Sequence, residues 1–74
     1  MATFQYFWAE GKSSSRNTWI AINLDAVTAA EEAEDYCLVH TGGTCYILSK
    51  KEYTRFIKAL QKRHTILDND GNVI

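Results

Sequence analysis

The sequence predicts a small α+β domain in which two helices cover one face of a single-layer, mainly antiparallel sheet, in the order β-β-α-β-α-β. Two segments near the N-terminus repeat with a period of two, which is typical of strands. Two later segments open with the Ser/Thr-x-x-Glu pattern that caps helices. A chain of 74 residues suffices for one hydrophobic core, so we assign 1–74 to a single domain.

The first two strands are predicted at residues 3–9 and 18–24, where strong β-formers recur at every second position. The small, polar residues 10–17 between them suit a long hairpin loop. Phe7 lies on one face of the first strand, and Trp19 lies on one face of the second. The opposite face of the first strand carries Phe4, Tyr6 and Trp8, and that of the second carries Ile20, Ile22 and Leu24.

A first helix is predicted at residues 28–39, behind a capping box formed by Thr28 and Glu31. Its inner face is small, which favours close packing on a sheet. That face consists of Ala30, Ala33 and Cys37, beside Tyr36. The glycines within 40–44 are expected to end this helix, and a short, mostly buried strand is predicted at 45–48.

A second helix is predicted at residues 50–64, behind a capping box formed by Ser49 and Glu52. Its apolar side chains recur with helical spacing and form one stripe. The stripe consists of Tyr53, Phe56, Ile57 and Leu60. The tail, 65–74, is expected to form a terminal strand or a small hairpin around the turn at Asp70 and the following glycine.

The composition is that of a globular domain, with 46% hydrophobic and 12% aromatic residues and no proline. These fractions exclude a disordered tail and a collagen-like chain. Residues 1–8 lack the basic start and apolar run of a secretory signal, so we expect a cytoplasmic protein. No apolar stretch approaches the roughly 20 residues that a membrane-spanning helix needs. So small a domain rarely encloses a substrate cleft, and we therefore expect no enzymatic activity.

Charge is strongly segregated along the chain, although the net charge is only −1. Six of the eight Lys and Arg residues lie in the second predicted helix, and five of the nine acids lie between residues 25 and 35. Around the axis of this helix, four basic residues lie within an arc of about 60°, on the face opposite the apolar stripe. This basic ridge consists of Lys51, Arg55, Lys58 and Lys62. It indicates an anionic partner. The alternatives are a solvated face and ion pairs with the acids of the first predicted helix.

The aromatic side chains Tyr6, Trp8 and Trp19 form a second candidate surface. Helices on one face of a sheet leave the other face open, and rings on an open face can stack on bases or anchor a protein. The alternative is that loops and the terminal hairpin cover these rings as a second small core.

Two cysteines and two histidines supply ligands of the kind that zinc prefers: Cys37, His40, Cys45 and His64. Their spacing resembles only part of a zinc knuckle, because these ligands come from different predicted elements. We therefore predict no cofactor and interpret the cysteines as thiols, with zinc as a weak alternative. Two further alternatives are a disulfide outside a reducing compartment and a Cys–His nucleophile, for which no orienting group is apparent.

These features predict a small, non-enzymatic binding or regulatory module, such as an inhibitor or adaptor of the type that mobile elements often encode. Its expected partner is a protein, contacted through the basic ridge and the sheet aromatics. The alternative is a nucleic-acid-binding domain that uses the same ridge, and the third reading is a small zinc-binding domain. Self-association into a homodimer is compatible with the first two readings.

Overall fold

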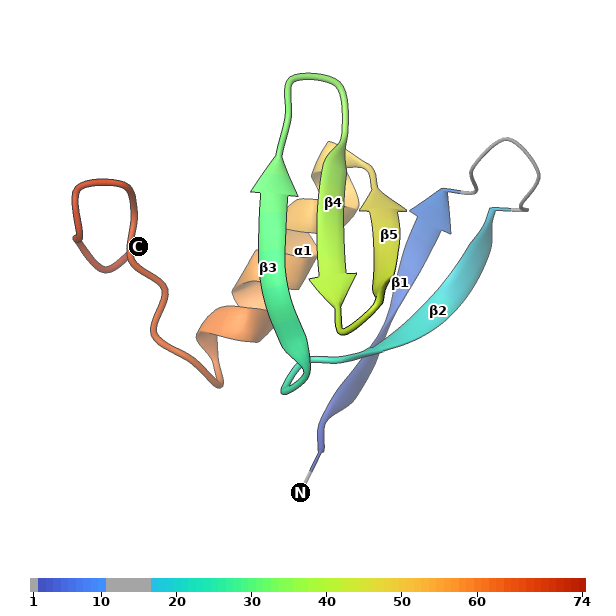
Figure 1. Ribbon diagram of the computed structural model, residues 1–74, viewed down its shortest axis with the longest axis horizontal. Coiled ribbons are helices and arrows are strands. Elements are labelled where there is room, and N and C mark those ends of the chain that lie inside the picture. Colours follow the sequence, from blue (N-terminus) through green and yellow to red (C-terminus); the bar gives the residue numbers. More distant parts are fainter. Residues whose placement is uncertain (1, 11–16) are drawn as a thin grey trace.

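The computed structural model describes residues 2–10 and 17–74, and within them it shows a five-stranded antiparallel sheet and one helix (Figure 1). The elements in chain order are β1 (Phe4–Glu10), β2 (Thr18–Asn23), β3 (Val27–Glu32), β4 (Cys37–Thr41), β5 (Thr44–Leu48) and α1 (Lys50–Gln61). The strand order in the sheet is β2-β1-β5-β4-β3. The predicted α+β class and antiparallel sheet are confirmed. The helix predicted at 28–39 and the predicted element order are wrong, because the described order is β-β-β-β-β-α.

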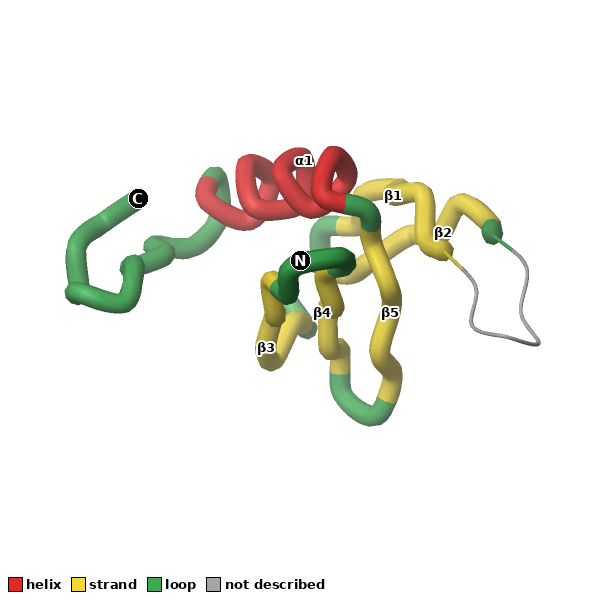
Figure 2. Tube along the Cα trace, turned by 90° about the horizontal axis from the view of Figure 1, so that it is seen from above, coloured by secondary structure: helices red, strands yellow, loops and turns green. Residues whose placement is uncertain are grey.

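The sheet curls at the junction of β1 with β5, where only two residue pairs join the strands: Ala9 with Leu48 and Glu10 with Ile47. Figure 2 shows the β1–β2 hairpin running across the direction of β4 and β5, with α1 above both. The helix therefore covers the concave side of the curled sheet. The core lies between them and consists of Phe7, Ala9, Ile22, Leu24, Val39, Leu48, Phe56 and Ala59.

The strands β1 and β2 form the predicted hairpin, with Phe7 opposite Ile20. The strand predicted at 45–48 is β5, which begins one residue earlier. Of the predicted loop 10–17, residues 11–16 lie outside the described residues.

The helix predicted at 28–39 is instead a β-hairpin made of β3 and β4. Cys37 and Val39 are fully buried and alternate with half-buried neighbours, so the true period here is two. Thr28 does not cap a helix, because its hydroxyl donates to the backbone carbonyl of His40 (3.2 Å). Ala and Glu favour helix locally, but pairing with β4 and packing of Ala30 on the core override that preference.

The glycines predicted to end this helix form the tight turn between β4 and β5, where Thr41 pairs with Thr44. Gly42, the first residue within the turn, has φ +58°, a conformation that favours glycine.

The second predicted helix is α1, which ends at Gln61, three residues before the predicted boundary at 64. Ser49 caps it, because the serine hydroxyl accepts the backbone N–H of Glu52 (3.2 Å). Phe56 is fully buried, and the rest of the predicted stripe packs against the core.

The tail forms the predicted small hairpin, in which Leu67 pairs with Val73. Asp68 stabilises its turn by accepting the backbone N–H groups of Asp70 and Asn72, both at 2.9 Å. Figure 1 shows this hairpin standing away from the sheet, on the side opposite β1 and β2.

Candidate functional site

Four large rings gather on the convex side of the β1–β2 hairpin, and we name them the aromatic face. Its members are Phe4, Tyr6, Trp8 and Trp19. Trp8 and Trp19 are directly opposite each other in the strand register, and their rings meet edge to face with centroids 5.5 Å apart. The exposed fractions are 61% for Phe4, 64% for Tyr6, 37% for Trp8 and 55% for Trp19, so this surface is open to solvent.

Strand alternation places the rings on this side. Phe7 points into the core, where its ring meets that of Phe56 edge to face at 5.7 Å. Tyr6 and Trp8 therefore point away from α1. The pairing of Trp19 with Trp8 brings the ring of β2 to the same side. Neither the terminal hairpin nor any other described segment buries these rings, so the described residues form no second small core over them.

The same side of the sheet continues across β5 and β4 with the half-buried side chains of Ile47 and Leu38, which pair with each other. Two exposed acids, Glu10 and Glu31, flank this apolar centre, since Glu10 pairs with Ile47 and Glu31 with Leu38. An apolar, aromatic centre with a charged rim is the usual anatomy of a protein interface. Sequence reasoning missed Ile47 and Leu38, because their position depends on the non-local register between β1 and β5.

The basic ridge is exposed along α1, but its four members are not equivalent. Arg55 donates through Nη1 to both carboxylate oxygens of Glu52, at 2.8 and 2.7 Å, and its guanidinium lies 5.4 Å from the Phe7 ring centroid. Arg55 is therefore a structural residue. The other three members of the ridge have no ion pair within the described residues; they are Lys51, Lys58 and Lys62.

The expected pairing of the ridge with the acids of residues 31–35 does not occur in the described residues. Lys50, outside the ridge, makes that contact instead. Its Nζ lies 3.6 Å from a carboxylate oxygen of Glu32 and donates to the carbonyl of Ala33. The ridge lysines thus remain available to an anionic partner.

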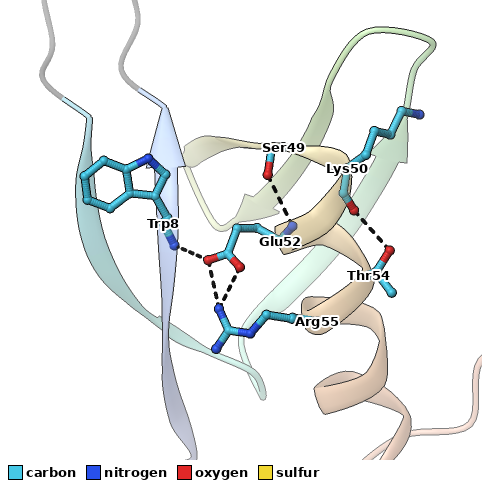
Figure 3. Close-up of polar contacts among 6 residues, drawn as sticks. All are labelled: Trp8, Ser49, Lys50, Glu52, Thr54 and Arg55. Atoms are coloured by element: carbon cyan, nitrogen blue, oxygen red, sulfur yellow. Dashed lines mark hydrogen bonds and ion pairs between the residues drawn. The ribbon is translucent and has the colours of Figure 1, made fainter.

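Glu52 joins α1 to β1, as Figure 3 shows. Glu52 is buried, with 7% of the residue exposed, and its carboxylate accepts the backbone N–H of Trp8 at 2.6 Å. The backbone N–H groups of Trp8 and Glu10 point to the same side of β1, because they are two residues apart on the strand. Glu10 pairs with β5, but β5 does not extend as far as Trp8, so Glu52 accepts the Trp8 N–H in place of a strand partner. Burial alone would raise the pKa of Glu52, but the hydrogen bonds from Arg55 and Trp8 outweigh it and lower that pKa.

Asp25, in the turn between β2 and β3, gathers a second polar cluster. It accepts hydrogen bonds from the Thr3 backbone N–H at 3.1 Å and from Arg63 at 2.9 Å, and its Oδ1 lies 3.4 Å from His64 Nε2. The hydrogen bond from Arg63 is the main cause that lowers the pKa of Asp25. The cluster ties the N-terminal segment to the end of α1.

The four zinc-type ligands are not brought together. Cys37 is fully buried on the concave side of the sheet, and Cys45 is half-buried on the convex side, opposite His40 in the strand register. His64 pairs with Asp25 instead. Residues 2–10 and 17–74 contain no group of three or more His, Cys, Asp or Glu side chains placed to hold a metal. Both cysteines are thiols, and burial raises the pKa of Cys37.

Comparison with family models, curated proteins and solved structures finds no match for this chain. Within the described residues, α1 is too short and too polar to cross a membrane, and no other helix is present.

Proposed function

We propose that this protein is a small, non-enzymatic binding module of the cytoplasm that contacts a partner protein through the aromatic face. The observation that carries the proposal is the set of four exposed rings on one side of two paired strands. A sequence that only needed to fold would gain more from burying these rings, because each offers 150–250 Å² of largely apolar surface, a generic range for aromatic side chains. Exposed aromatic patches of this kind typically mark contacts with other molecules.

A protein partner is favoured over nucleic acid by the distribution of charge. Nucleic-acid surfaces interleave rings with cations, so that bases stack while phosphates are neutralised. Here β1 stands between the rings and α1, so the aromatic face and the basic ridge lie on different faces of the molecule. Among the described residues, the acid beside the rings is Glu10 at the end of β1, which would repel phosphates, and Glu31 lies farther along the same side, on β3. A partner with a basic or neutral rim around an apolar centre fits this surface.

Nucleic-acid binding stays as the second candidate because three ridge lysines are exposed without an ion pair in the described part of the chain. In that mode Lys51, Lys58 and Lys62 would follow a phosphate backbone along α1 without base stacking. Such binding would weaken steeply as salt rises, because each neutralised phosphate releases counterions.

Affinity capture with matched variants separates the two candidates. The bait with Trp19→Ala lacks one ring of the aromatic face. The control, Tyr36→Ala, lacks an exposed ring (46%) in the turn between β3 and β4. After nuclease treatment, we expect wild type and the control to retain the same captured protein. The Trp19 variant should bind that protein at least tenfold more weakly, because truncating a hot-spot ring typically costs roughly 2 kcal/mol of binding free energy. Equal retention by both variants would contradict the proposal.

The second candidate is tested with labelled duplex and single-stranded oligonucleotides at low and physiological salt. A triple charge reversal of the three ridge lysines to glutamate is the control variant. Binding that is lost in this variant and falls with salt would move nucleic acid to first place.

A further inference from the structure

The two edge strands of the sheet, β2 and β3, differ in how they are protected against pairing with another strand. The strand β3 has a register shift between Val27 and Ala29, and its far end carries the exposed acids Glu31 and Glu32. Lys50 also lies at that end, with its Nζ 3.6 Å from a carboxylate oxygen of Glu32. Bulges and charged side chains are the usual features that prevent an edge strand from pairing, so β3 is a protected edge.

The strand β2 has none of these features. Its sequence, Thr-Trp-Ile-Ala-Ile-Asn, is uncharged and rich in β-formers, and its register with β1 is continuous. Figure 1 shows β2 at the border of its hairpin, with no described segment beyond it. An exposed, regular and uncharged edge strand is a template for pairing with another strand.

The register with β1 identifies the backbone groups of β2 that point outward. The N–H of Leu24 donates to the carbonyl of Thr3 (2.8 Å), which fixes the alternation of this antiparallel ladder. The even-numbered residues of β2 therefore bond to β1, and the N–H and C=O groups of Trp19 and Ala21 point away from it. Among the described residues these groups have no backbone partner, and the Trp19 carbonyl takes only a long contact from the Thr18 hydroxyl (3.4 Å).

A second copy of β2 matches these outward groups. A two-fold axis at Ile20 places Trp19 of each copy opposite Ala21 of the other, and each of these residues then donates its N–H and accepts with its C=O. An axis at Ala21 would instead place Trp19 opposite Asn23, whose carbonyl already accepts the N–H of Ala26 (3.1 Å). The backbone therefore favours the register centred on Ile20.

The side chains suit the same register. Trp19 and Ala21 both lie on the convex side of the sheet, so each large ring meets a methyl group of the other copy. Ile20, which is half-buried on the concave side, meets Ile20 of the second copy in a close pair without hydrogen bonds. Since β2 carries no charge, two copies of it meet without repulsion. The strand thus complements itself in backbone groups, in size and in charge.

We propose that two copies of this chain form a dimer by antiparallel pairing of their β2 strands about a two-fold axis at Ile20. The two sheets then become one continuous sheet, and the two aromatic faces lie side by side on its convex side. The contact uses one short strand from each copy, so we expect a dissociation constant on the order of 100 µM. This dimer does not depend on the partner protein proposed above.

Sedimentation velocity of the full chain, from about 10 µM to about 1 mM, tests the proposal. Ala21→Pro removes an N–H that β1 does not use, so it should keep the fold, checked by circular dichroism, and weaken the dimer at least tenfold. Glu32→Pro is the matched control on the other edge. Its N–H also points outward, because the neighbouring Ala33 N–H donates to the Tyr36 carbonyl (2.9 Å), and the dimer should be unchanged.

Phe4→Ala separates this contact from the aromatic face. It removes an exposed ring of that face from β1 and leaves β2 intact, so it should weaken partner capture and leave the dimer unchanged. A dimer that Phe4→Ala abolishes would be one in which the aromatic faces meet, and it would overturn the proposal. A wild-type protein that stays monomeric to about 1 mM would overturn the dimer, and partner capture would still test the proposed function separately.

Amide hydrogen exchange of wild type, followed by NMR, gives a second test that needs no variant. The amides of Trp19 and Ala21 should exchange about threefold or more slowly at about 1 mM than at about 10 µM, because pairing protects them. The amide of Ile20, which bonds to β1 in the monomer, should exchange equally slowly at both concentrations. A dimer in which Trp19 and Ala21 exchange as fast as in the monomer would contradict pairing through β2.

Discussion

Replacing Glu52 with alanine should destabilise the domain far more than its place in a helix of exposed charges would suggest. The buried carboxylate accepts the Trp8 backbone N–H at 2.6 Å, and a hydrogen bond to a charged group contributes about 1.5–3 kcal/mol. Arg55, its ion-pair partner, is 44% exposed, so the pair adds no more than about 1 kcal/mol. The sum is a loss of about 1.5–4 kcal/mol, which approaches the whole stability of a domain this small.

Urea unfolding, followed by the fluorescence of the two tryptophans, measures this loss. Glu52→Gln keeps an acceptor for the Trp8 amide without the charge, and we expect it to cost about 1 kcal/mol. Lys51→Ala, the exposed neighbour, is the control and should stay within about 0.5 kcal/mol of wild type. If Glu52→Ala unfolds at the wild-type urea concentration, the assignment of Glu52 as the link between α1 and β1 is refuted.

The pH dependence of wild-type stability follows from the lowered pKa of Glu52. A carboxylate whose folded pKa lies below its unfolded value stabilises the fold fully above the unfolded pKa, about 4.3 for glutamate. That stabilisation is lost as the pH falls through the folded pKa. The stability difference between wild type and Glu52→Gln should therefore be largest near neutral pH and shrink in acid. A difference that grows below pH 4 would contradict the cited hydrogen bonds as its cause.

Three further predictions concern the strand faces, the tight turn and the Asp25 cluster. Phe7→Ala should cost about 3–5 kcal/mol and leave the domain largely unfolded by circular dichroism, whereas Tyr6→Ala, one position earlier and 64% exposed, should cost less than about 1 kcal/mol. An added Cβ meets nothing within 4 Å at Gly42 or Gly43, so only the backbone conformation distinguishes the two positions. Gly42→Ala should lower the free energy of unfolding by about 1 kcal/mol, measured by thermal unfolding, because Gly42 has a positive φ, whereas Gly43→Ala should leave it nearly unchanged. Asp25→Asn should remove part of the acid sensitivity of the fold. The pKa of Asp25 is lowered in the folded protein, so wild type loses stability as the pH falls through that folded pKa. Identical profiles of stability against pH for the two proteins would contradict a stabilising role of this cluster.

Local signals in the sequence predict much of this fold. The period of two in β1 and β2, the serine cap of α1 and the turn of the terminal hairpin are each contained within a few residues, and the structure confirms them. The hairpin of β3 and β4 could not be predicted in this way. Its Ala and Glu residues favour a helix locally, and the strand state is stabilised by pairing between two segments and by burial of Cys37 and Val39.

The candidate site shows the same division between local and non-local signals. Alternation along β1 predicts the shared face of Tyr6 and Trp8, and exposure of the ridge lysines follows from the helical period of α1. The role of Glu52 was not predicted, because its pattern in the sequence is that of a capping residue. Its actual partners, apart from Arg55, lie on a strand more than 40 residues away in the chain. The pairing of β1 with β5, which completes the convex surface, is likewise non-local.

The central claim, that the aromatic face binds a partner protein, is tested most directly by the accessibility of the tryptophans. Both tryptophans of the chain belong to this face, so acrylamide quenching of their fluorescence reports on it alone. We predict that the captured partner protein shields them and shifts their emission to shorter wavelength, in wild type and equally in the triple charge reversal of the ridge lysines. Partner binding that leaves quenching unchanged would contradict the claim, as would shielding by a single-stranded oligonucleotide that the charge reversal abolishes.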